Sequence, residues 1–126
     1  MECACIENDF DGPYVEILTD KIRRARKCHT CNECRREISP GEHYRYESYA
    51  DDGRVDHHKT CADCNSIRIE MFCGSFCYGD ILSEVREYVS DANGDIPEDC
   101  LVALTPNARG RICEMIEEVW EGLHGK

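Results

Sequence analysis

Large apolar side chains are scarce in this sequence. Leu, Ile, Val and Phe together number 24 of the 126 residues, and the formal net charge is -11. So few apolar residues and so large a net charge fall in the composition range of intrinsically disordered chains. The 11 cysteines argue against disorder, because cross-links or bound metals can supply the stability that a small core cannot.

Long apolar runs and targeting features are also absent. Residues 1–5 are acidic and show neither the basic stretch nor the apolar stretch of a secretory signal. No run approaches the roughly 20 apolar residues that a membrane-spanning helix needs, and no repeat of fixed period occurs. The length is usual for one domain. We therefore expect a soluble, acidic, cytoplasmic protein that forms a single compact domain.

Eight of the cysteines form four close pairs. Two pairs have Cys-x2-Cys spacing, Cys31 with Cys34 and Cys61 with Cys64. Each pair can present two thiolates on a tight turn, and two pairs complete the tetrahedral four-sulfur site that Zn²⁺ prefers. The odd number of cysteines and the lack of an export signal argue against a disulfide framework. The spacing predicts a structural zinc site formed by these four residues.

The other two pairs suggest a second zinc site. Cys3 and Cys5 lie on an extended segment, whereas Cys73 and Cys77 are spaced as on one helical turn. Each pair can chelate one metal, so an N-terminus folded back beside the second pair would complete another four-cysteine site. The alternative is that these thiols only pack against their neighbours. We expect two zinc ions per chain.

Two further residues compete for the first site. Cys28 precedes the first Cys-x2-Cys pair by three residues, and His58 precedes the second by three. Cys34 is preferred to Cys28 because it stands closer to the turn into which a zinc knuckle should lead. Cys64 is preferred to His58 because two equal pairs complete the site without a histidine. Cys28 in place of Cys34 and His58 in place of Cys64 remain open as alternative ligands.

The segment between the two pairs predicts a β-hairpin followed by a helix. Residues 43–49 are rich in strand formers, residues 51–53 form a turn signal, and residues 54–58 return as the second strand. Thr60 is a suitable N-cap for a helix over residues 61–72, which would carry two cysteines in its first turn. A knuckle, a hairpin and a helix in this order are typical of a treble clef.

The C-terminal part predicts helices. A helix follows Asp80 and ends at residues 93–94, a short apolar turn spans residues 97–104, and a longer helix runs from Thr105 to about Gly122. Both helices show an apolar stripe, and the remaining cysteines of this part, Cys100 and Cys113, are expected in the core.

These elements predict an α+β fold. A small treble-clef-like zinc core of about residues 1–78 would be joined by a helical C-terminal subdomain of about residues 79–126.

Several motifs occur together in about residues 1–90. They are the N-terminal Cys-x-Cys, the basic stretch 23–27, the knuckle 31–34, the turn 38–42 with Tyr44, residues 59–64 and the cysteine-rich segment 73–80. In this combination the chain resembles a group of small zinc-binding proteins encoded by phages and prophages, whose function is unassigned. The resemblance implies a viral accessory protein that acts in the cytoplasm of an infected bacterial host.

The charges are unevenly distributed. Residues 21–36 hold 7 of the 15 basic residues and only one acid, so the rest of the chain carries 8 basic and 25 acidic residues. The acidic body could imitate nucleic acid and occupy a basic groove on a host protein, such as a defence or nucleic-acid-handling complex. We therefore expect an accessory protein that binds and modulates a host protein, as an anti-defence inhibitor would.

Two alternative functions stay open. The first is a nucleic-acid-binding zinc protein that acts through residues 21–36, although this strip could also be a solvated strand or neutralise the thiolates. The second is a degenerate nuclease, because the strand with His57 resembles the one that carries the catalytic histidine of HNH nucleases. The Asn-bearing linker and the later metal-binding His of those enzymes are missing, so we do not expect an enzyme.

Overall fold

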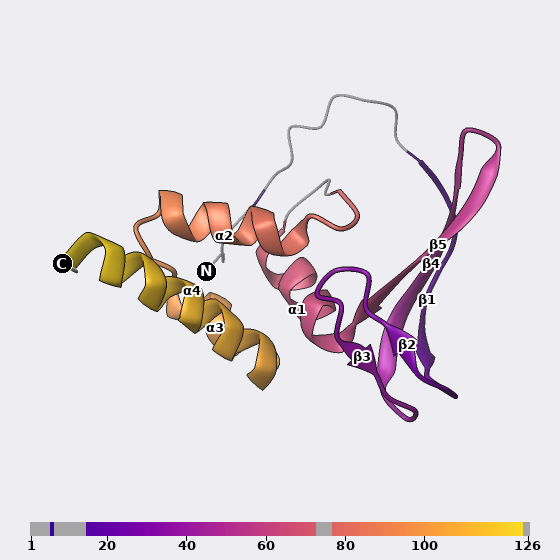
Figure 1. Ribbon diagram of the computed structural model, residues 1–126, viewed down its shortest axis with the longest axis horizontal. Helices are drawn as coiled ribbons and strands as arrows, with labels where there is room; N and C mark the ends of the chain where they lie inside the picture. The colour runs from indigo at the N-terminus through magenta and orange to yellow at the C-terminus, as the bar shows by residue number, and fades with distance from the viewer. Residues whose placement is uncertain (1–5, 7–14, 73–76, 125–126) are drawn as a thin grey trace.

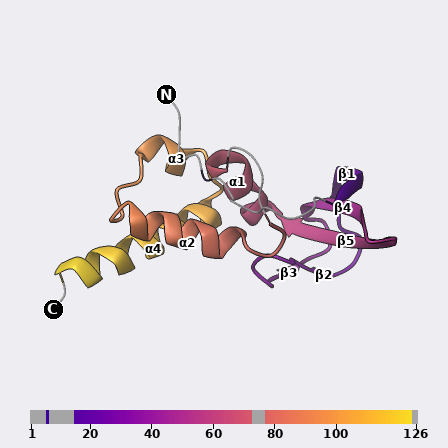
Figure 2. The same cartoon turned by 90° about the horizontal axis from the view of Figure 1, so that it is seen from above.

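The computed structural model describes residues 6, 15–72 and 77–124, and these form an α+β fold as predicted. Strands lie at one end of the molecule and helices at the other (Figures 1 and 2). In chain order the elements are β1 (Glu16–Arg24), β2 (His29–Thr30), β3 (Glu37–Ile38), β4 (His43–Asp51), β5 (Arg54–Cys61), α1 (Ala62–Met71), α2 (Ile81–Asp91), α3 (Glu98–Val102) and α4 (Pro106–His124).

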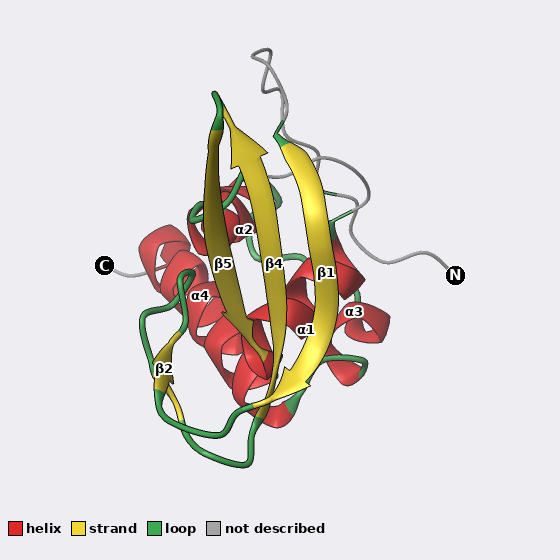
Figure 3. Cartoon of the chain, turned by 90° about the vertical axis from the view of Figure 1, so that its right-hand side faces the viewer, coloured by secondary structure: helices red, strands yellow, loops and turns green. Residues whose placement is uncertain are grey.

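The larger sheet is antiparallel and has the order β1-β4-β5. The predicted hairpin is confirmed as β4 and β5, joined at Asp52 and Gly53, whose φ angles are 57° and 79°. Positive φ at both positions is the two-residue turn that matches the right-handed twist of paired strands. The helices lie behind this sheet in the view of Figure 3, so one face of the sheet turns toward the helices and the other turns away from them.

Strand β1 brings the basic segment onto the sheet. It pairs with β4 on both sides of a register shift between Ile17 and Thr19, with Lys21 opposite Tyr46 and Arg23 opposite Tyr44. Eight of its nine residues are exposed, and only Thr19 is half-buried. Main-chain pairing with β4 therefore holds β1 in place, and its outward side chains remain available to solvent.

Helix α1 begins one residue later than predicted. The cap is Cys61, whose Sγ accepts a hydrogen bond from the Cys64 amide at 3.4 Å. Thr60 is fully buried at the end of β5, so its prediction as the N-cap is wrong. A cysteine sulfur can accept a hydrogen bond from a free amide of the first helical turn, as a serine or threonine hydroxyl does. Cys61 takes this position here because it is one residue closer to the helix than Thr60.

The predicted start of α4 is confirmed. The Thr105 hydroxyl accepts a hydrogen bond from the Ala108 amide at 3.3 Å and donates one to Asp63 Oδ1 of α1 at 2.7 Å. The same side chain thus caps α4 and ties it to α1.

Two apolar clusters form the interior of the described residues. The larger lies among the helices, where the predicted stripes of α2 and α4 meet α1, while Leu123 at the end of the α4 stripe stays exposed. The smaller surrounds the cysteines at the junction of sheet and helices and comprises Ala25, Cys31, Ile38, Tyr44, Cys61 and Cys64. Among the described residues, no helix combines the length and the apolarity needed to cross a membrane.

Candidate metal centre

Four cysteine thiols converge between the sheet and α1. Cys31 and Cys34 lie in the turn between β2 and β3, Cys61 ends β5, and Cys64 lies in the first turn of α1. Their four sulfur atoms all lie within 4.8 Å of one another, and Cys34 Sγ is 3.8 Å from Cys61 Sγ. A zinc ion with Zn–S bonds of about 2.3 Å holds its sulfurs about 3.8 Å apart. The cluster therefore has the dimensions of a four-thiolate metal site.

Backbone amides point at the sulfurs. Cys31 Sγ accepts hydrogen bonds from the amides of Glu33, Cys34 and Cys61 at 3.4, 3.5 and 3.3 Å. The tight turn that makes this possible uses Arg35 at a φ of 70° and a bond from its amide to the Cys31 carbonyl. Such donors stabilise negative charge on sulfur and fix the orientation of the ligands.

The thiols influence one another strongly. Hydrogen bonds from Cys61 and Cys64 hold the pKa of Cys31 far below its ordinary value. The hydrogen bond with Cys31 raises the pKa of Cys61 to about 12, and the pKa of Cys64 is raised further by its bonds to Cys31 and Cys61. The cluster therefore favours one thiolate, at Cys31, and disfavours the ionisation of Cys61 and Cys64. Four thiolates this close together repel one another, so a bound cation is needed to stabilise them.

The site is closed. Cys31, Cys61 and Cys64 are buried and Cys34 is half-buried, and all four positions of a tetrahedron are taken by protein sulfurs. A catalytic zinc site keeps a position open for water or substrate, whereas a structural site does not. Among the described residues, no other group of His, Cys, Asp and Glu side chains converges in this way.

The second predicted site falls largely outside the described residues. Cys3, Cys5 and Cys73 are not among them, and Cys77 is described and half-buried. A second site therefore stays a prediction. Cys100 is fully buried in the helical core, as predicted, and is disulfide-bonded, which the sequence did not predict.

The two competing ligand candidates lie apart from the four sulfurs and have other partners. Cys28 is exposed and donates a hydrogen bond to Glu37 at 2.8 Å, which raises the pKa of the Cys28 thiol. His58 is buried with Nε2 2.8 Å from Glu33 Oε2, and its ring stacks on Tyr78 at 4.1 Å. The nuclease-like His57 is exposed and contacts the Tyr46 hydroxyl.

Glu33 connects the knuckle to the helical half. Its side chain is fully buried, and its two oxygens accept hydrogen bonds from the amides of Gly79 at 2.7 Å and Ile81 at 3.1 Å. These amides lie at the start of α2, where the helix dipole favours a carboxylate. Asp80 is the predicted N-cap of α2, but its side chain makes no capping hydrogen bond. The carboxylate of Glu33, 47 positions earlier in the sequence, binds the amides at the start of α2 instead. No local sequence signal could have shown this contact.

A second buried carboxylate fastens the inner face of the sheet. Glu47 of β4 forms a two-point ion pair with Arg68 of α1, with distances of 2.8 and 3.1 Å, and accepts a hydrogen bond from the Tyr78 hydroxyl at 3.0 Å. Burial and the charge of Glu47 raise the pKa of Tyr78. Polar contacts thus join the sheet to the helices where few apolar side chains are present.

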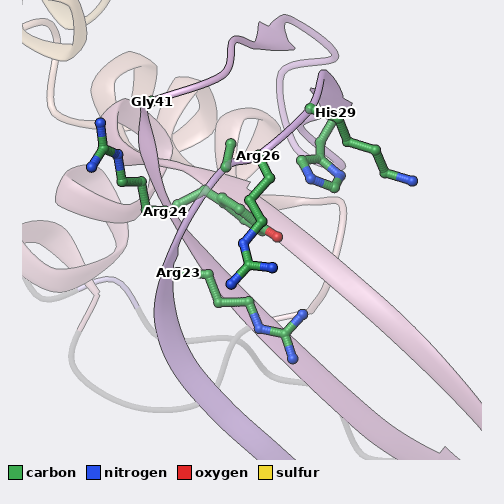
Figure 4. A pocket seen from close by; sticks show the side chains of 8 residues that line it. Arg23, Arg24, Arg26, His29 and Gly41 are labelled. Carbon is green, nitrogen blue, oxygen red and sulfur yellow. The ribbon is translucent and has the colours of Figure 1, made fainter.

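The basic strip separates into two parts. Arg36 lies beside the cysteines and pairs with Glu42 at 3.0 Å and with Asp63 at 3.3 Å. The other part surrounds an open cavity of about 1180 Å³ next to the end of β1 (Figure 4). Burial, with the charges of Lys59, Lys27 and Arg23, lowers the pKa of His29 in its wall. The cavity is lined by Arg23, Arg24, Ala25, Arg26, Lys27, His29, Gly41 and Tyr44.

No family model, curated protein or solved structure matches this chain. The resemblance to phage and prophage proteins therefore stays a prediction.

Proposed function

We propose that the four thiols hold a structural Zn²⁺ and that the chain is a non-enzymatic binding protein built on a treble-clef-like core. Four soft thiolates in a tetrahedron favour zinc over hard cations such as Mg²⁺ or Ca²⁺. The order of knuckle, β4–β5 hairpin and α1, with ligands at both ends of the hairpin, supports the treble-clef interpretation. The closed coordination supports a role in folding rather than in catalysis.

The partner is a protein with a basic surface, which binds at the helical end. The observation that carries this proposal is the division of charge. Residues 15–72 contain eleven acidic and eleven basic residues, whereas residues 77–124 contain eleven acidic and three basic residues. On α4, the acidic side chains Glu114, Glu117, Glu118 and Glu121 are all exposed. Complementary charge steers such partners together and sets their orientation.

An apolar groove lies within this acidic surface. It has a volume of about 370 Å³ and runs between α2 and α4, where Met115, Val119 and Leu123 contribute apolar side chains beside Glu118. The neighbouring Trp120 is 49% exposed, although its Nε1 donates to the Asn93 carbonyl at 3.2 Å. Arg86 also lines the groove and pairs with Glu118 at 2.7 Å. The acids without an ion pair among the described residues, which would attract a basic amphipathic segment, are therefore Glu114, Glu117 and Glu121 elsewhere on α4. A partly exposed tryptophan is a common anchor in interfaces.

The phage resemblance would make this partner a host protein. In that setting the acidic end would occupy a groove that otherwise accommodates nucleic acid, as an anti-defence inhibitor would. The acidic surface of the helical end supports the protein-binding part of this proposal.

Charge reversal on α4 tests the proposal. Tagged full-length protein is used to capture partners from a bacterial lysate, and each captured protein is then purified and its affinity measured at several salt concentrations. Glu117→Lys with Glu121→Lys should weaken binding at least about tenfold, mainly through a slower on-rate, and reduce its salt dependence.

Asp51→Lys with Asp56→Lys is the matched control, because both residues are exposed acids at the sheet end. This pair should change the affinity less than twofold. Equal losses in the two double variants, or a partner without a basic surface, would overturn the proposal.

A further inference from the structure

The basic side chains around the cavity form no ion pairs with described carboxylates, in contrast to four other arginines of the chain. Arg36, Arg45, Arg68 and Arg86 each lie within 4.0 Å of a carboxylate. Among the described residues, no carboxylate forms an ion pair with Arg23, Arg24, Arg26 or Lys27. Their charges are therefore not neutralised within the described part of the chain.

The backbone holds these charges together. Ala25, in the middle of the basic segment, is buried and hydrogen-bonds through its amide to the Glu42 carbonyl and through its carbonyl to the Gly41 amide, both at 2.8 Å. Gly41 has a φ of 95°, a conformation that favours glycine. Arg23 and Arg26 extend on the same side of this fixed segment, whereas Arg24 extends to the other side (Figure 4). Like charges that line one cavity are stabilised by an anion bound among them.

An open aromatic surface adjoins the cavity. The face of the sheet turned away from the helices is covered by none of them in Figure 3. The neighbours of Tyr46 in β4, Arg45 and Glu47, contact α1, so the half-buried Tyr46 side chain lies on the opposite face, where it also packs against the cluster around the cysteines. The guanidinium of Arg23 is 3.7 Å from its ring centre, and the His57 ring is stacked at 5.6 Å. Lys21 and Lys59 are the partners of Tyr46 on the two neighbouring strands. The result is a row of planar groups across three strands, flanked by lysines.

We propose that this face and the adjoining cavity bind single-stranded nucleic acid. Phosphates lie along Arg26 and Lys27, and bases stack on the row formed by Arg23, Tyr46 and His57. Planar aromatic and guanidinium groups stack on unpaired bases of any sequence, and nearby cations track the backbone. A duplex offers no free base face to such a row, and the sheet has no protruding helix that could enter a groove. This surface lies at the opposite end from the α2–α4 groove and does not depend on a partner there.

Fluorescence anisotropy of the zinc-loaded full chain tests the site. The probes are labelled 20-nucleotide oligo(dT) and oligo(U), a 20-base-pair duplex, and inorganic polyphosphate as competitor. We expect a dissociation constant of about 10 μM or tighter for a single strand at about 50 mM salt, which is within the range of non-specific binding. Binding to the duplex should be at least about fivefold weaker. No binding at 100 μM protein, or equal or tighter binding of the duplex, would overturn the proposal.

A double variant with a matched control locates the site. Arg26→Gln with Lys27→Gln should weaken single-strand binding about tenfold and reduce the slope of log K against log salt by about 1.4, because each phosphate contact on a single strand contributes about 0.7. Arg54→Gln with Arg111→Gln also removes two exposed positive charges, away from the cavity. This control should change the affinity less than twofold, and equal losses would place the binding elsewhere and overturn the assignment.

Stacking is tested separately from charge. Tyr46→Leu should weaken oligonucleotide binding at least about fivefold, because stacking on one aromatic side chain contributes about 1–3 kcal/mol per base. It should leave the inhibition constant of polyphosphate unchanged. His57→Ala, at an exposed position, should also weaken oligonucleotide binding without changing the inhibition constant of polyphosphate, but by a smaller factor. This variant replaces Tyr46→Leu in the test if Tyr46→Leu does not fold. Equal effects on both ligands would reduce the site to a general anion site and contradict the nucleic-acid assignment.

Discussion

The Cys61 sulfur serves two functions at the junction of β5 and α1. It lies within the four-sulfur cluster, and as the N-cap of α1 it also accepts a hydrogen bond from the Cys64 amide. Serine can replace the second function but not the first, because an alcohol is a poor zinc ligand. Cysteine-to-serine variants therefore separate metal binding from local helix capping.

Metal content ranks the ligands. Replacing any one of Cys31, Cys34, Cys61 or Cys64 by serine should remove one zinc per chain or abolish soluble folding, because zinc binding supplies folding free energy in such domains. His58→Ala should keep the zinc content, measured by elemental analysis, since His58 Nε2 pairs with Glu33. Loss of zinc in His58→Ala together with its retention in Cys64→Ser would show that the ligand assignment is wrong.

Tyr78 should make stability fall at high pH. Burial and Glu47 raise the pKa of its hydroxyl above the ordinary value of 10.0, so the folded chain keeps this proton when the unfolded chain has lost it. The stabilisation is complete below about pH 10 and is lost as pH rises from there toward the folded pKa.

Tyr78→Phe removes this titration. The free energy of unfolding, measured in urea between pH 8 and 11 under reducing conditions, should decline less steeply for Tyr78→Phe than for the unaltered chain. Tyr88→Phe is a control on α2. Parallel pH profiles for the unaltered chain and Tyr78→Phe would contradict the role of Tyr78.

At the scale of elements, local signals predicted those elements whose ends are marked in the sequence. The Asp52–Gly53 turn fixed the hairpin, and Thr105 marked the start of α4, where its hydroxyl caps the helix. The four-cysteine cluster was also predictable, because short spacings bring its ligands together in pairs. The pairing of β1 was not predicted, since β1 buries neither face and therefore shows no period-2 alternation.

Contacts between distant elements were likewise beyond the reach of sequence patterns. Glu33 was one acid in a basic strip, and its partners lie 25, 46 and 48 positions away. Glu47 and Arg68 are separated by 21 positions, and each is an ordinary charged residue in its own strand or helix. Only the packed chain shows that these charges are buried and paired.

Glu33→Gln tests how the knuckle and α2 are joined. Glutamine has almost the same shape, but it offers only one acceptor oxygen, and its NH₂ would face a backbone donor at Gly79 or Ile81. We expect a loss of about 1–3 kcal/mol in the free energy of unfolding, the cost of leaving a buried donor without a partner. Zinc content should stay unchanged. Glu37→Gln, an exposed acid of the same knuckle region, should change stability by less than about 0.5 kcal/mol.

At the scale of the whole molecule, the cysteine cluster lies between two ends of different charge. The sheet end is balanced overall and gathers, around one cavity, cations without ion pairs to described residues, whereas the helical end is strongly acidic. A single net charge of -11 therefore describes neither surface. Binding at either end is best followed with variants that alter only that end.

Removing the metal should affect both ends. The core around the cysteines is small, and Glu33, between two of the proposed ligands, holds the start of α2. Chelation should therefore abolish the near-UV signal of the tyrosines and reduce the far-UV helical signal, with recovery on adding zinc. The control is the same chelator already saturated with zinc. A metal-free chain with unchanged spectra would contradict a structural role for the metal.

The buried carboxylate of Glu33 also makes two backbone amides into reporters of the distant cysteine cluster. The Gly79 and Ile81 N–H groups are held by a side chain that belongs to the knuckle, 46 and 48 positions earlier in the chain. Their exchange with deuterium requires this carboxylate to withdraw, as well as any local opening of α2. In a mixture of zinc-loaded and metal-free molecules, these two amides would divide into slowly and rapidly labelled populations. The slowly labelled fraction at Gly79 and Ile81 would then measure how many molecules contain zinc.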